Sequence, residues 1–198
     1  MSNSKPTYIA PLSDKPSDPD ALLLDRLKRG DETALSDLID RHIKKIHAVA
    51  YRMLGDRMQA EDVAQMVFLN FWQTAPNWES GRGRVLTYLY RVTTHRCLDI
   101  LRKSKETFPG ELPDIEDHRP DALDKLHQND QRIEIESALA QLSRRQRAAL
   151  TLFYYEHQSL KDASKILEMT PSAFESLLRR ARQSLKSFLN HDIVETIL

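Results

Sequence analysis

The sequence predicts an all-α protein built from two small helical domains that are joined by a flexible acidic linker. Apolar residues recur at spacings of three and four, which marks one face of a helix, and no segment alternates strictly enough to indicate a strand. The residues that break helices are clustered. All five glycines lie between positions 30 and 110, and seven of the nine prolines lie within 6–19 or 109–120. The stretches between these clusters are therefore free to form helices.

The first domain is expected at residues 20–104. Gly30 ends a short helix, Asp31 can cap the next one, and Gly55 ends it. Asp56 then opens a further segment, which Pro76 stops. Its apolar residues repeat with the period of a helix and predict the core. They are Leu35, Leu38, Ile39, Ile43, Ile46, Val49, Ala50 and Met53, then Val63, Val67, Phe68, Phe71 and Trp72, then Val85, Leu86, Leu89, Tyr90, Val92, Cys97, Leu98 and Leu101.

The remaining segments differ in polarity. Residues 1–19 are rich in Ser, Asp and Pro and predict a disordered N-terminal arm. Residues 105–131 are polar, acidic and Pro-containing, and predict the linker. A second helical domain is expected at 132–190, followed by a C-terminal tail at 191–198. Its helical apolar positions are Ile135, Leu139, Leu142, Ala149, Leu150, Leu152 and Phe153, then Leu160, Ala163, Ile166 and Leu167, then Phe174, Leu177, Leu178, Ala181, Leu185 and Leu189.

The composition of the 198 residues excludes several classes of protein. A single cysteine excludes a disulfide framework and a cysteine-based structural zinc site. No apolar run approaches the roughly 20 residues that a membrane span needs. The Pro-rich start of the chain has no apolar stretch and is not a signal peptide. We therefore expect a cytoplasmic protein.

Catalytic residues are not apparent in the sequence. The seven histidines are scattered, and none has a carboxylate at a metal-ligand spacing on one helix face. Cys97 lies in an apolar helical stretch, which indicates a core position rather than a nucleophile. Neither a glycine-rich phosphate loop nor a nucleophile elbow is present. We expect a protein that is not an enzyme and that uses no metal or cofactor.

Charge is unevenly distributed along the chain. Lys plus Arg and Asp plus Glu both number 29, so the formal net charge is zero. Residues 81–105, however, hold seven basic residues against Asp99 alone, a net charge of +6. Phosphates respond to such a local patch rather than to the total charge. The segment therefore favours contact with nucleic acid.

Residues 159–182 have the pattern of a helix-turn-helix. Ser159 and Thr170 stand where two short helices begin, Pro171 suits the first turn of the second, and Ala163 is small enough for close helix approach. Such a motif inserts the start of its second helix into the major groove. The residues expected to face DNA are Ser172, Ala173, Glu175, Ser176, Arg179, Arg180 and Arg182. The alternative is an ordinary helical hairpin with a solvated basic face.

Aromatic residues lie near the basic segment. Trp72, Trp78, Tyr88 and Tyr90 flank or belong to it, and single-stranded DNA is held by such mixtures of stacking rings and cations. For any one of these rings, a place in the core is the competing interpretation. The two glycines in the loop 77–83 permit close backbone approach to a ligand.

These motifs together resemble the extracytoplasmic-function (ECF) sigma factors of bacterial RNA polymerase. Residues 60–65 (AEDVAQ) resemble the polymerase-binding segment of that family, and 86–103 resemble its promoter-melting and −10-reading helices. Residues 142–147 and 175–182 resemble its −35-reading module. The first domain is thus similar to sigma region 2 and the second to sigma region 4.

The resemblance implies a protein without catalytic activity that binds core RNA polymerase and directs promoter-specific transcription initiation. Its first domain would dock on the β′ coiled coil and open the DNA at the −10 element. Its second domain would read the −35 element, with the β flap as a further polymerase contact. The resemblance also implies an anti-sigma factor that buries both DNA-reading surfaces. A stand-alone helix-turn-helix regulator is the alternative, and it would bind duplex DNA tightly without polymerase.

The resemblance also implies roles for individual residues. Polymerase contacts would be made by Glu61, Asp62, Gln65 and Phe68. Contacts to the −10 element and to single-stranded DNA would be made by Trp78, Ser80, Arg82, Arg84, Tyr88, Arg91, His95, Arg96, Asp99, Arg102 and Lys103. The loop 78–83 would hold an unstacked base of the non-template strand.

Three residues depart from the pattern of the family. His95 stands where Asn is usual, which changes the hydrogen-bonding groups offered to DNA. Met66 replaces a common Glu in the polymerase-binding segment. Glu168 replaces the common glycine of the helix-turn-helix turn, and it predicts a different turn or a strained residue there.

Overall fold

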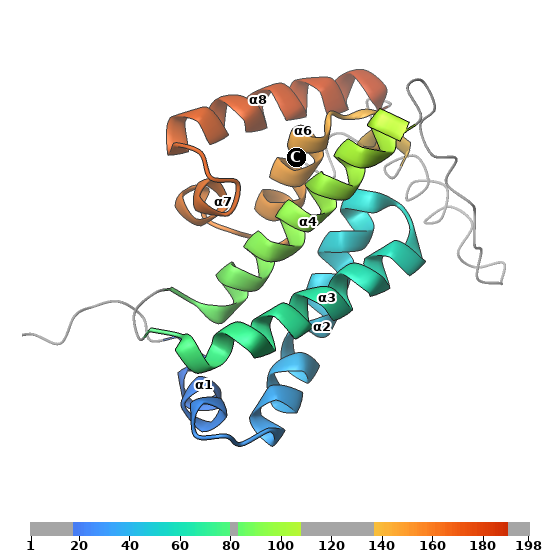
Figure 1. Cartoon of the computed structure of the whole chain (residues 1–198). Coiled ribbons are helices and arrows are strands. Elements are labelled where there is room, and N and C mark those ends of the chain that lie inside the picture. Colours follow the sequence, from blue (N-terminus) through green and yellow to red (C-terminus); the bar gives the residue numbers. More distant parts are fainter. Residues whose placement is uncertain (1–17, 80–82, 108–136, 190–198) are drawn as a thin grey trace, which may run out of the picture.

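The computed structural model describes residues 18–79, 83–107 and 137–189, and these residues are helical without any strand, as predicted (Figure 1). The first domain comprises α1 (Ala21–Lys28), α2 (Thr33–Leu54), α3 (Arg57–Thr74), the 3-10 turn η1 (Ala75–Asn77) and α4 (Val85–Thr107). The second comprises a short helix at 137–141, α6 (Arg144–Leu150), the π-helical turn η3 (Thr151–Tyr155), α7 (Leu160–Ile166) and α8 (Pro171–Phe188). The expected arm and linker lie almost wholly outside the described residues, and the expected tail lies wholly outside them.

The helices begin and end at the residues that the sequence marks. Asp56 caps α3 by accepting from the Gln59 backbone N–H at 3.0 Å. Ser159 caps α7 and Thr170 caps α8 in the same way, at 3.1 and 3.2 Å. Gly55 ends α2 in the left-handed region, with φ of 74°. Most local signals for helix ends are therefore confirmed. Asp31 differs, because the N-cap of α2 is Glu32, although the Asp31 carboxylate accepts from the Thr33 backbone N–H at 3.0 Å. Helix α4 continues three residues beyond the expected domain end.

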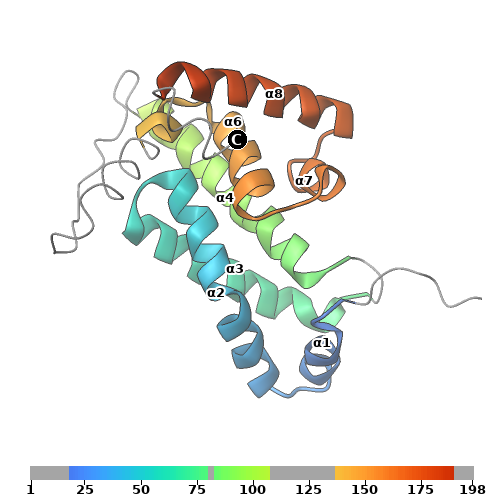
Figure 2. The same cartoon turned by 180° about the vertical axis from the view of Figure 1, so that it is seen from behind.

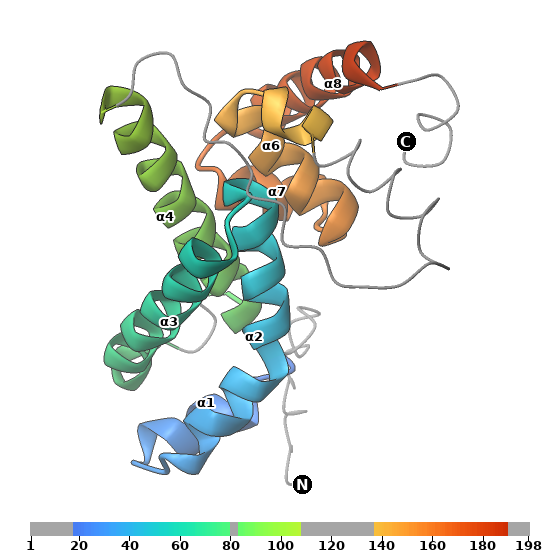
Figure 3. The same cartoon turned by 90° about the vertical axis from the view of Figure 1, so that its right-hand side faces the viewer.

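Helix α2 is the centre of the first domain, since it packs against α1, α3 and α4 (Figure 3). Its inner face carries Leu38, Ile46, Val49 and Met53, all of which are fully buried. Phe71 of α3 is also fully buried in this core. The predicted apolar stripe thus forms the domain interior.

A buried carboxylate holds the start of α1 onto α2. Asp20 accepts hydrogen bonds from Arg41 at 2.6 Å and from His42 at 2.8 Å, and it is only 2% exposed. Burial acts to raise the pKa of Asp20, but the hydrogen bonds from His42 and Arg41 outweigh it and hold that pKa below its ordinary value of 3.8. The ionised form is therefore the one that the fold favours.

Replacing Asp20 with Asn is expected to lower the free energy of unfolding at pH 7 by about 2–3 kcal/mol, because one partner of a buried charged pair is lost. The lowered pKa means that ionised Asp20 stabilises the fold above about pH 4 and ceases to do so as the pH falls through that pKa. Urea unfolding at pH 7 and at pH 3 measures both effects. The deficit should shrink in acid, and an equal deficit at both pH values would contradict the assignment. Asp40→Asn, on the exposed side of α2, is the control.

The second domain is built around α8, which packs against α6 and α7 (Figure 2). Ser143 begins α6 with a capping box, in which its hydroxyl and the Gln146 side chain bond reciprocally to the backbone. Phe174 of α8 and Ile166 of α7 are fully buried. The small residue Ala163 is also fully buried, as the helix-turn-helix pattern predicts.

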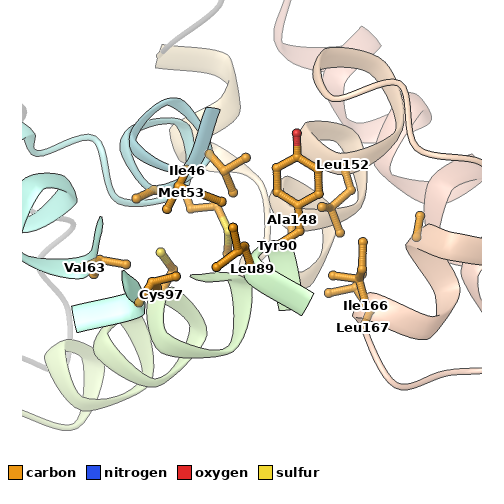
Figure 4. Close-up of a cluster of buried hydrophobic side chains, with 14 of the residues drawn as sticks. Ile46, Met53, Val63, Leu89, Tyr90, Cys97, Ala148, Leu152, Ile166 and Leu167 are labelled. Atoms are coloured by element: carbon orange, nitrogen blue, oxygen red, sulfur yellow. The ribbon is translucent and has the colours of Figure 1, made fainter. Parts of the chain in front are cut away.

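The two domains also pack against one another. Helix α4 contacts α6 and α7, and α2 contacts α6 and η3. Figure 4 shows Met53 and Tyr90 of the first domain beside Ala148 and Leu152 of the second. Buried apolar side chains of both domains form a single cluster. Within the described residues, no helix is long and apolar enough to span a bilayer.

Candidate nucleic-acid interface

Helix α4 is amphipathic, with one buried face and one basic face. Val85, Leu89 and Cys97 are fully buried on its inner side. Exposed basic side chains lie along the rest of the helix: Arg84 just before it, then Arg91, Arg96, Arg102 and Lys103. Asp99 is half-buried and pairs with Arg102 at 3.0 Å. The outer face therefore presents mainly guanidinium groups, which suit phosphate oxygens.

The aromatic residues near this face have different positions. Trp78 is 7% exposed and packs edge-on against Tyr88, with ring centroids 5.2 Å apart. The Trp78 ring packs against Tyr88 and is too buried to stack with a base. Tyr88 is half-buried, and its hydroxyl donates to Asn70 at 3.1 Å. Tyr90 is 1% exposed, as its core interpretation requires. Trp72 is 47% exposed on α3, so the prediction of a core position for Trp72 is wrong.

A hollow lies where these aromatic and basic residues meet. Its walls are formed by Trp78, Gly83, Arg84, Thr87, Tyr88 and Arg91, and on one side by Lys165 and Ile166 of α7. Ser80 and Arg82, the other expected members of this loop, lie outside the described residues. The hollow combines rings with cations, which is the chemistry that holds an unstacked base and its phosphate.

The start of α4 is anchored from a distant part of the chain. The Asp18 carboxylate accepts from the Val85 backbone N–H at 2.8 Å and from the Asp20 backbone N–H at 3.1 Å. The segment before α1 thereby supplies a partner to the first turn of α4, 67 residues along the chain. No sequence pattern indicated this contact.

His95 and Glu168 meet where α4 faces the helix-turn-helix. The His95 Nε2 donates to the Ile166 carbonyl at 3.1 Å. The Glu168 carboxylate lies 3.9 Å from His95 and 4.0 Å from Arg91. Glu168 has φ of 52°, in the left-handed region, so the turn keeps the conformation that suits glycine while carrying a charged side chain. The predicted strain at this position is therefore present.

Helix α3 presents a mixed acidic and apolar face. Glu61, Asp62 and Gln65 are exposed, as expected of contacts to a partner. Phe68 is only 5% exposed and belongs to the core, so the expectation that it contacts a partner is corrected. Val67 and Phe68 both face the inside of the domain, and Leu69, the next residue, faces outward. The large exposed apolar residues of this helix are Met58, Met66, Leu69 and Trp72.

Five exposed residues of α3 share one helical stripe that the sequence analysis missed. Positions 58, 62, 65, 69 and 72 follow the alternating spacings of three and four that a coiled-coil seam uses. The signal was present in the sequence, but the core pattern of the same helix obscured it. The stripe fits a helical partner.

Most of the helix-turn-helix residues that are expected to face DNA have exposed side chains. Ser172, Ala173, Glu175, Arg179 and Arg180 are exposed along the first half of α8, and Ser176 is half-buried. Arg182 differs, because its guanidinium lies over the Tyr154 ring at 5.5 Å and its Nε is buried. It therefore packs on its own domain rather than extending freely toward DNA.

Catalytic chemistry finds no support in the described part of the chain. No group of three or more His, Cys, Asp or Glu side chains there is arranged to hold a metal ion. Cys97 is fully buried, and burial raises the pKa of its thiol to about 12, so it carries no thiolate at neutral pH. The surfaces described above suit binding instead.

Comparison with known proteins assigns both domains. Residues 38–107 match the family Sigma-70 region 2, and residues 132–185 match Sigma-70, region 4. These two regions define a sigma factor, the promoter-specificity subunit of bacterial RNA polymerase. The chain belongs to the ECF sigma factor family. It therefore binds core RNA polymerase and promoter DNA and directs transcription initiation.

Individual relatives support the family over most of the chain. The ECF RNA polymerase sigma factor SigW of Bacillus subtilis is 26% identical over 184 residues, a match that covers 83% of this chain and 93% of the relative. SigE of Mycolicibacterium smegmatis is 27% identical over 176 residues, covering 84% and 67%.

Two solved structures share the fold. CnrH, in complex with the cytosolic domain of CnrY, has a TM-score of 0.65 at 20% identity and covers 86% of this chain and 96% of that one. The sigma factor RpoE from Bartonella quintana, in complex with the anti-sigma factor NepR, has a TM-score of 0.63 at 21% identity and covers 79% and 97%.

Proposed function

We propose that this sigma factor uses three separate surfaces. The stripe on α3 binds core polymerase, the basic face of α4 opens the −10 element, and α8 reads the −35 element. The observation that carries the proposal is the presence, in one chain, of an exposed helix-turn-helix face and a separate basic helix beside a hollow. A simple duplex-binding regulator needs only the first of these. Melting a promoter also needs a surface for single-stranded DNA.

The stripe on α3 suits the β′ coiled coil. Exposed apolar residues at its ends offer area to bury. Asp62 between them, with Glu61 beside the stripe, attracts a basic partner surface and fixes its register. Met66 lies beside this stripe and is 51% exposed, so it adds apolar area where the family commonly has an acid.

The −10 element would enter between α4 and the loop before it. Arg84, Arg91 and Arg96 would contact the backbone, while Tyr88 and the hollow would receive an unstacked base. Trp78 would support that hollow through its contact with Tyr88. His95 would offer an imidazole N–H in place of the usual amide.

In vitro transcription tests this function. Core polymerase with the purified chain should start transcripts at a subset of promoters in a library, and core polymerase alone should not. Gel shifts with and without core enzyme separate this function from that of a stand-alone regulator. Tight binding to a palindromic duplex without polymerase, together with no transcription from any promoter, would overturn the proposal.

Arg179→Ala is expected to weaken −35 recognition by about 5- to 150-fold, since one good base contact contributes about 1–3 kcal/mol. The exposed position of Arg179 on α8 means that the fold and the polymerase contact should stay intact. Transcription from promoters with and without the −35 element measures the effect, and Arg29→Ala at the exposed end of α1 is the control. Equal losses on both promoters, or weakened polymerase binding, would contradict the assignment.

We also infer that an anti-sigma factor controls this protein in the cytoplasm. The two solved structures described above are complexes with a second protein, and RpoE is bound by an anti-sigma factor. An anti-sigma factor could bury the exposed apolar residues on α3 and Phe188 at the end of α8. Co-purification from the native host, followed by inhibition of transcription by the captured protein, tests this.

A further inference from the structure

A tight turn before α1 holds the side chain of Asp18 in a fixed place. The Asp18 backbone carbonyl accepts from the Ala21 N–H at 3.0 Å, and Asp20, the third residue of the turn, has φ of −96° and ψ of 3°. A type I turn favours aspartate at its first position and proline, here Pro19, at its second. The Asp18 Oδ1 accepts from the Asp20 backbone N–H at 3.1 Å. The turn therefore uses one carboxylate oxygen of Asp18 and leaves the other for a second donor.

The other carboxylate oxygen of Asp18 binds the first turn of α4. Its Oδ2 accepts from the Val85 backbone N–H at 2.8 Å, and Val85 is fully buried. The first N–H groups of a helix have no partner within the helix, and here a residue 67 positions earlier supplies one. A carboxylate at this end of a helix also interacts favourably with the helix dipole. Asp18 therefore fixes the place where α4 begins.

The turn that carries Asp18 is itself held by packed elements. The Asp20 carboxylate is buried and accepts from Arg41 and His42 of α2. Helix α1 follows the turn directly and contacts η1, the 3-10 turn after α3. Figures 1 and 2 show α1 at the same end of the first domain as the start of α4. These contacts make the turn a rigid support for α4.

The hollow at the start of α4 includes the residues next to the one that Asp18 holds. Arg84 directly precedes Val85, and Thr87 and Tyr88 lie in the same turn of the helix; these three line the hollow. The Tyr88 N–H donates to the Arg84 carbonyl at 3.2 Å, so Tyr88 belongs to the turn that Asp18 caps. A binding site requires its side chains to be held within about 0.5 Å of the productive geometry. Movement of this turn would therefore displace the cation and the ring together.

We propose that Asp18 is a positioning residue for promoter opening: its carboxylate holds the first turn of α4 so that Arg84 and Tyr88 can receive the unstacked −10 base. The proposal rests on the function assigned to the hollow. Asp18 acts through the Val85 N–H and makes no contact with the base. Its loss should therefore weaken the contribution of that one base and leave the other promoter contacts in place.

The test measures how strongly holoenzyme binding depends on the unstacked base, with and without Asp18. The template is a promoter from the transcription experiment, opened by mismatches across the −10 element, and a matched set carries one abasic site at each non-template position in turn. The abasic site that weakens wild-type binding most, by at least about 5-fold, identifies the base in the hollow. In Asp18→Ala the same abasic site should weaken binding by less than about twofold, since removing one of two coupled groups removes their joint contribution.

Two further variants separate positioning from a general effect on the fold. Asp18→Asn keeps a side-chain oxygen that can accept from the Val85 N–H, so its abasic penalty should stay within about twofold of the wild-type value. Asp25→Ala removes an exposed carboxylate from α1 and should keep the full penalty. Each protein is compared with itself on two templates, so a lower fraction of active protein affects both measurements equally.

The outcomes distinguish the positioning role from the function of the hollow. A full penalty in Asp18→Ala, beside a full penalty in the wild type, would reject the positioning role and leave the proposed function standing. Equal losses of the penalty in Asp18→Ala and Asp25→Ala, or a penalty lost in Asp18→Asn, would also overturn the role of this hydrogen bond. If no abasic site weakens binding of the wild-type holoenzyme, the hollow holds no base, and the function assigned to it is wrong.

Discussion

Replacing Asp62 with Lys is expected to abolish binding to core polymerase while the fold remains intact. Asp62 is exposed in the middle of the α3 stripe, between Met58 and Leu69, so a lysine there would face the polymerase surface with the wrong charge. Juxtaposed like charges at an interface cost several kcal/mol, which corresponds to an affinity loss of at least about 100-fold. Pull-down with core enzyme and in vitro transcription measure the loss.

The matched control is Asp40→Lys, which reverses an exposed charge on α2 outside the stripe. It should leave polymerase binding unchanged, and circular dichroism should show equal helix content in both variants. Wild-type affinity in Asp62→Lys, or equal losses in both proteins, would show that α3 does not dock on the polymerase.

Arg147→Met is expected to lower the free energy of unfolding by about 3–5 kcal/mol. Arg147 donates to three backbone carbonyls, those of Leu139 at 2.8 Å, Ala140 at 2.5 Å and Met53 at 2.8 Å. Burial lowers the pKa of its guanidinium below the ordinary value, and the three acceptors hold the charged group in place. Methionine fills much of the volume but makes none of these bonds. The Leu139 carbonyl keeps the hydrogen bond from the Leu142 N–H, whereas the carbonyls of Ala140 and Met53 lose the donor that Arg147 supplied, at about 1–3 kcal/mol each.

Urea unfolding, monitored by circular dichroism, measures this change. Arg145→Met is the control, because Arg145 is an exposed neighbour on the same helix, and it should shift stability by less than about 0.5 kcal/mol. Similar unfolding curves for the two variants would contradict this prediction and would show that water replaces Arg147 as the hydrogen-bond donor to these carbonyls.

Local chemistry made the helices predictable. Asp56, Ser159 and Thr170 satisfy backbone N–H groups within three residues of themselves, so their role depends on little else in the protein. The apolar period of α2 likewise depends only on which of its faces is covered. The fold class and the helix-turn-helix therefore followed from the sequence without knowledge of the tertiary contacts.

Three expected site residues are more buried than free contact with a partner would suggest, and their burial depends on their neighbours. Phe68 and Leu69 are adjacent apolar residues on α3, and only the packing of that helix decides which one is buried. Trp78 lies in a loop, where periodicity gives no information, and its burial follows from contacts with Phe71 and Tyr88. Arg182 is basic and near DNA-facing positions, yet the Tyr154 ring lies within its reach.

The contact between the domains had no signal in the sequence. Arg52 of α2 donates to Glu156 at 3.0 Å, although the two are 104 residues apart and neither belongs to a motif. Single charged residues are common on helices, so only the tertiary arrangement identifies the pair. Glu168 was noticed as a departure from glycine, but its neighbours Arg91 and His95 became apparent only in three dimensions.

The anchoring of Val85 by Asp18 has a practical consequence for anyone who cuts this protein into pieces. The region 2 match begins at residue 38, and a fragment that starts there would lack α1 as well as the carboxylates of Asp18 and Asp20. The first turn of α4 would lose its remote partner, and His42 would be left buried without its acid. Truncated proteins that are meant to isolate promoter opening should therefore begin before Asp18. In a shorter fragment, a loss of DNA melting could result from a disrupted fold rather than from the loss of a DNA contact.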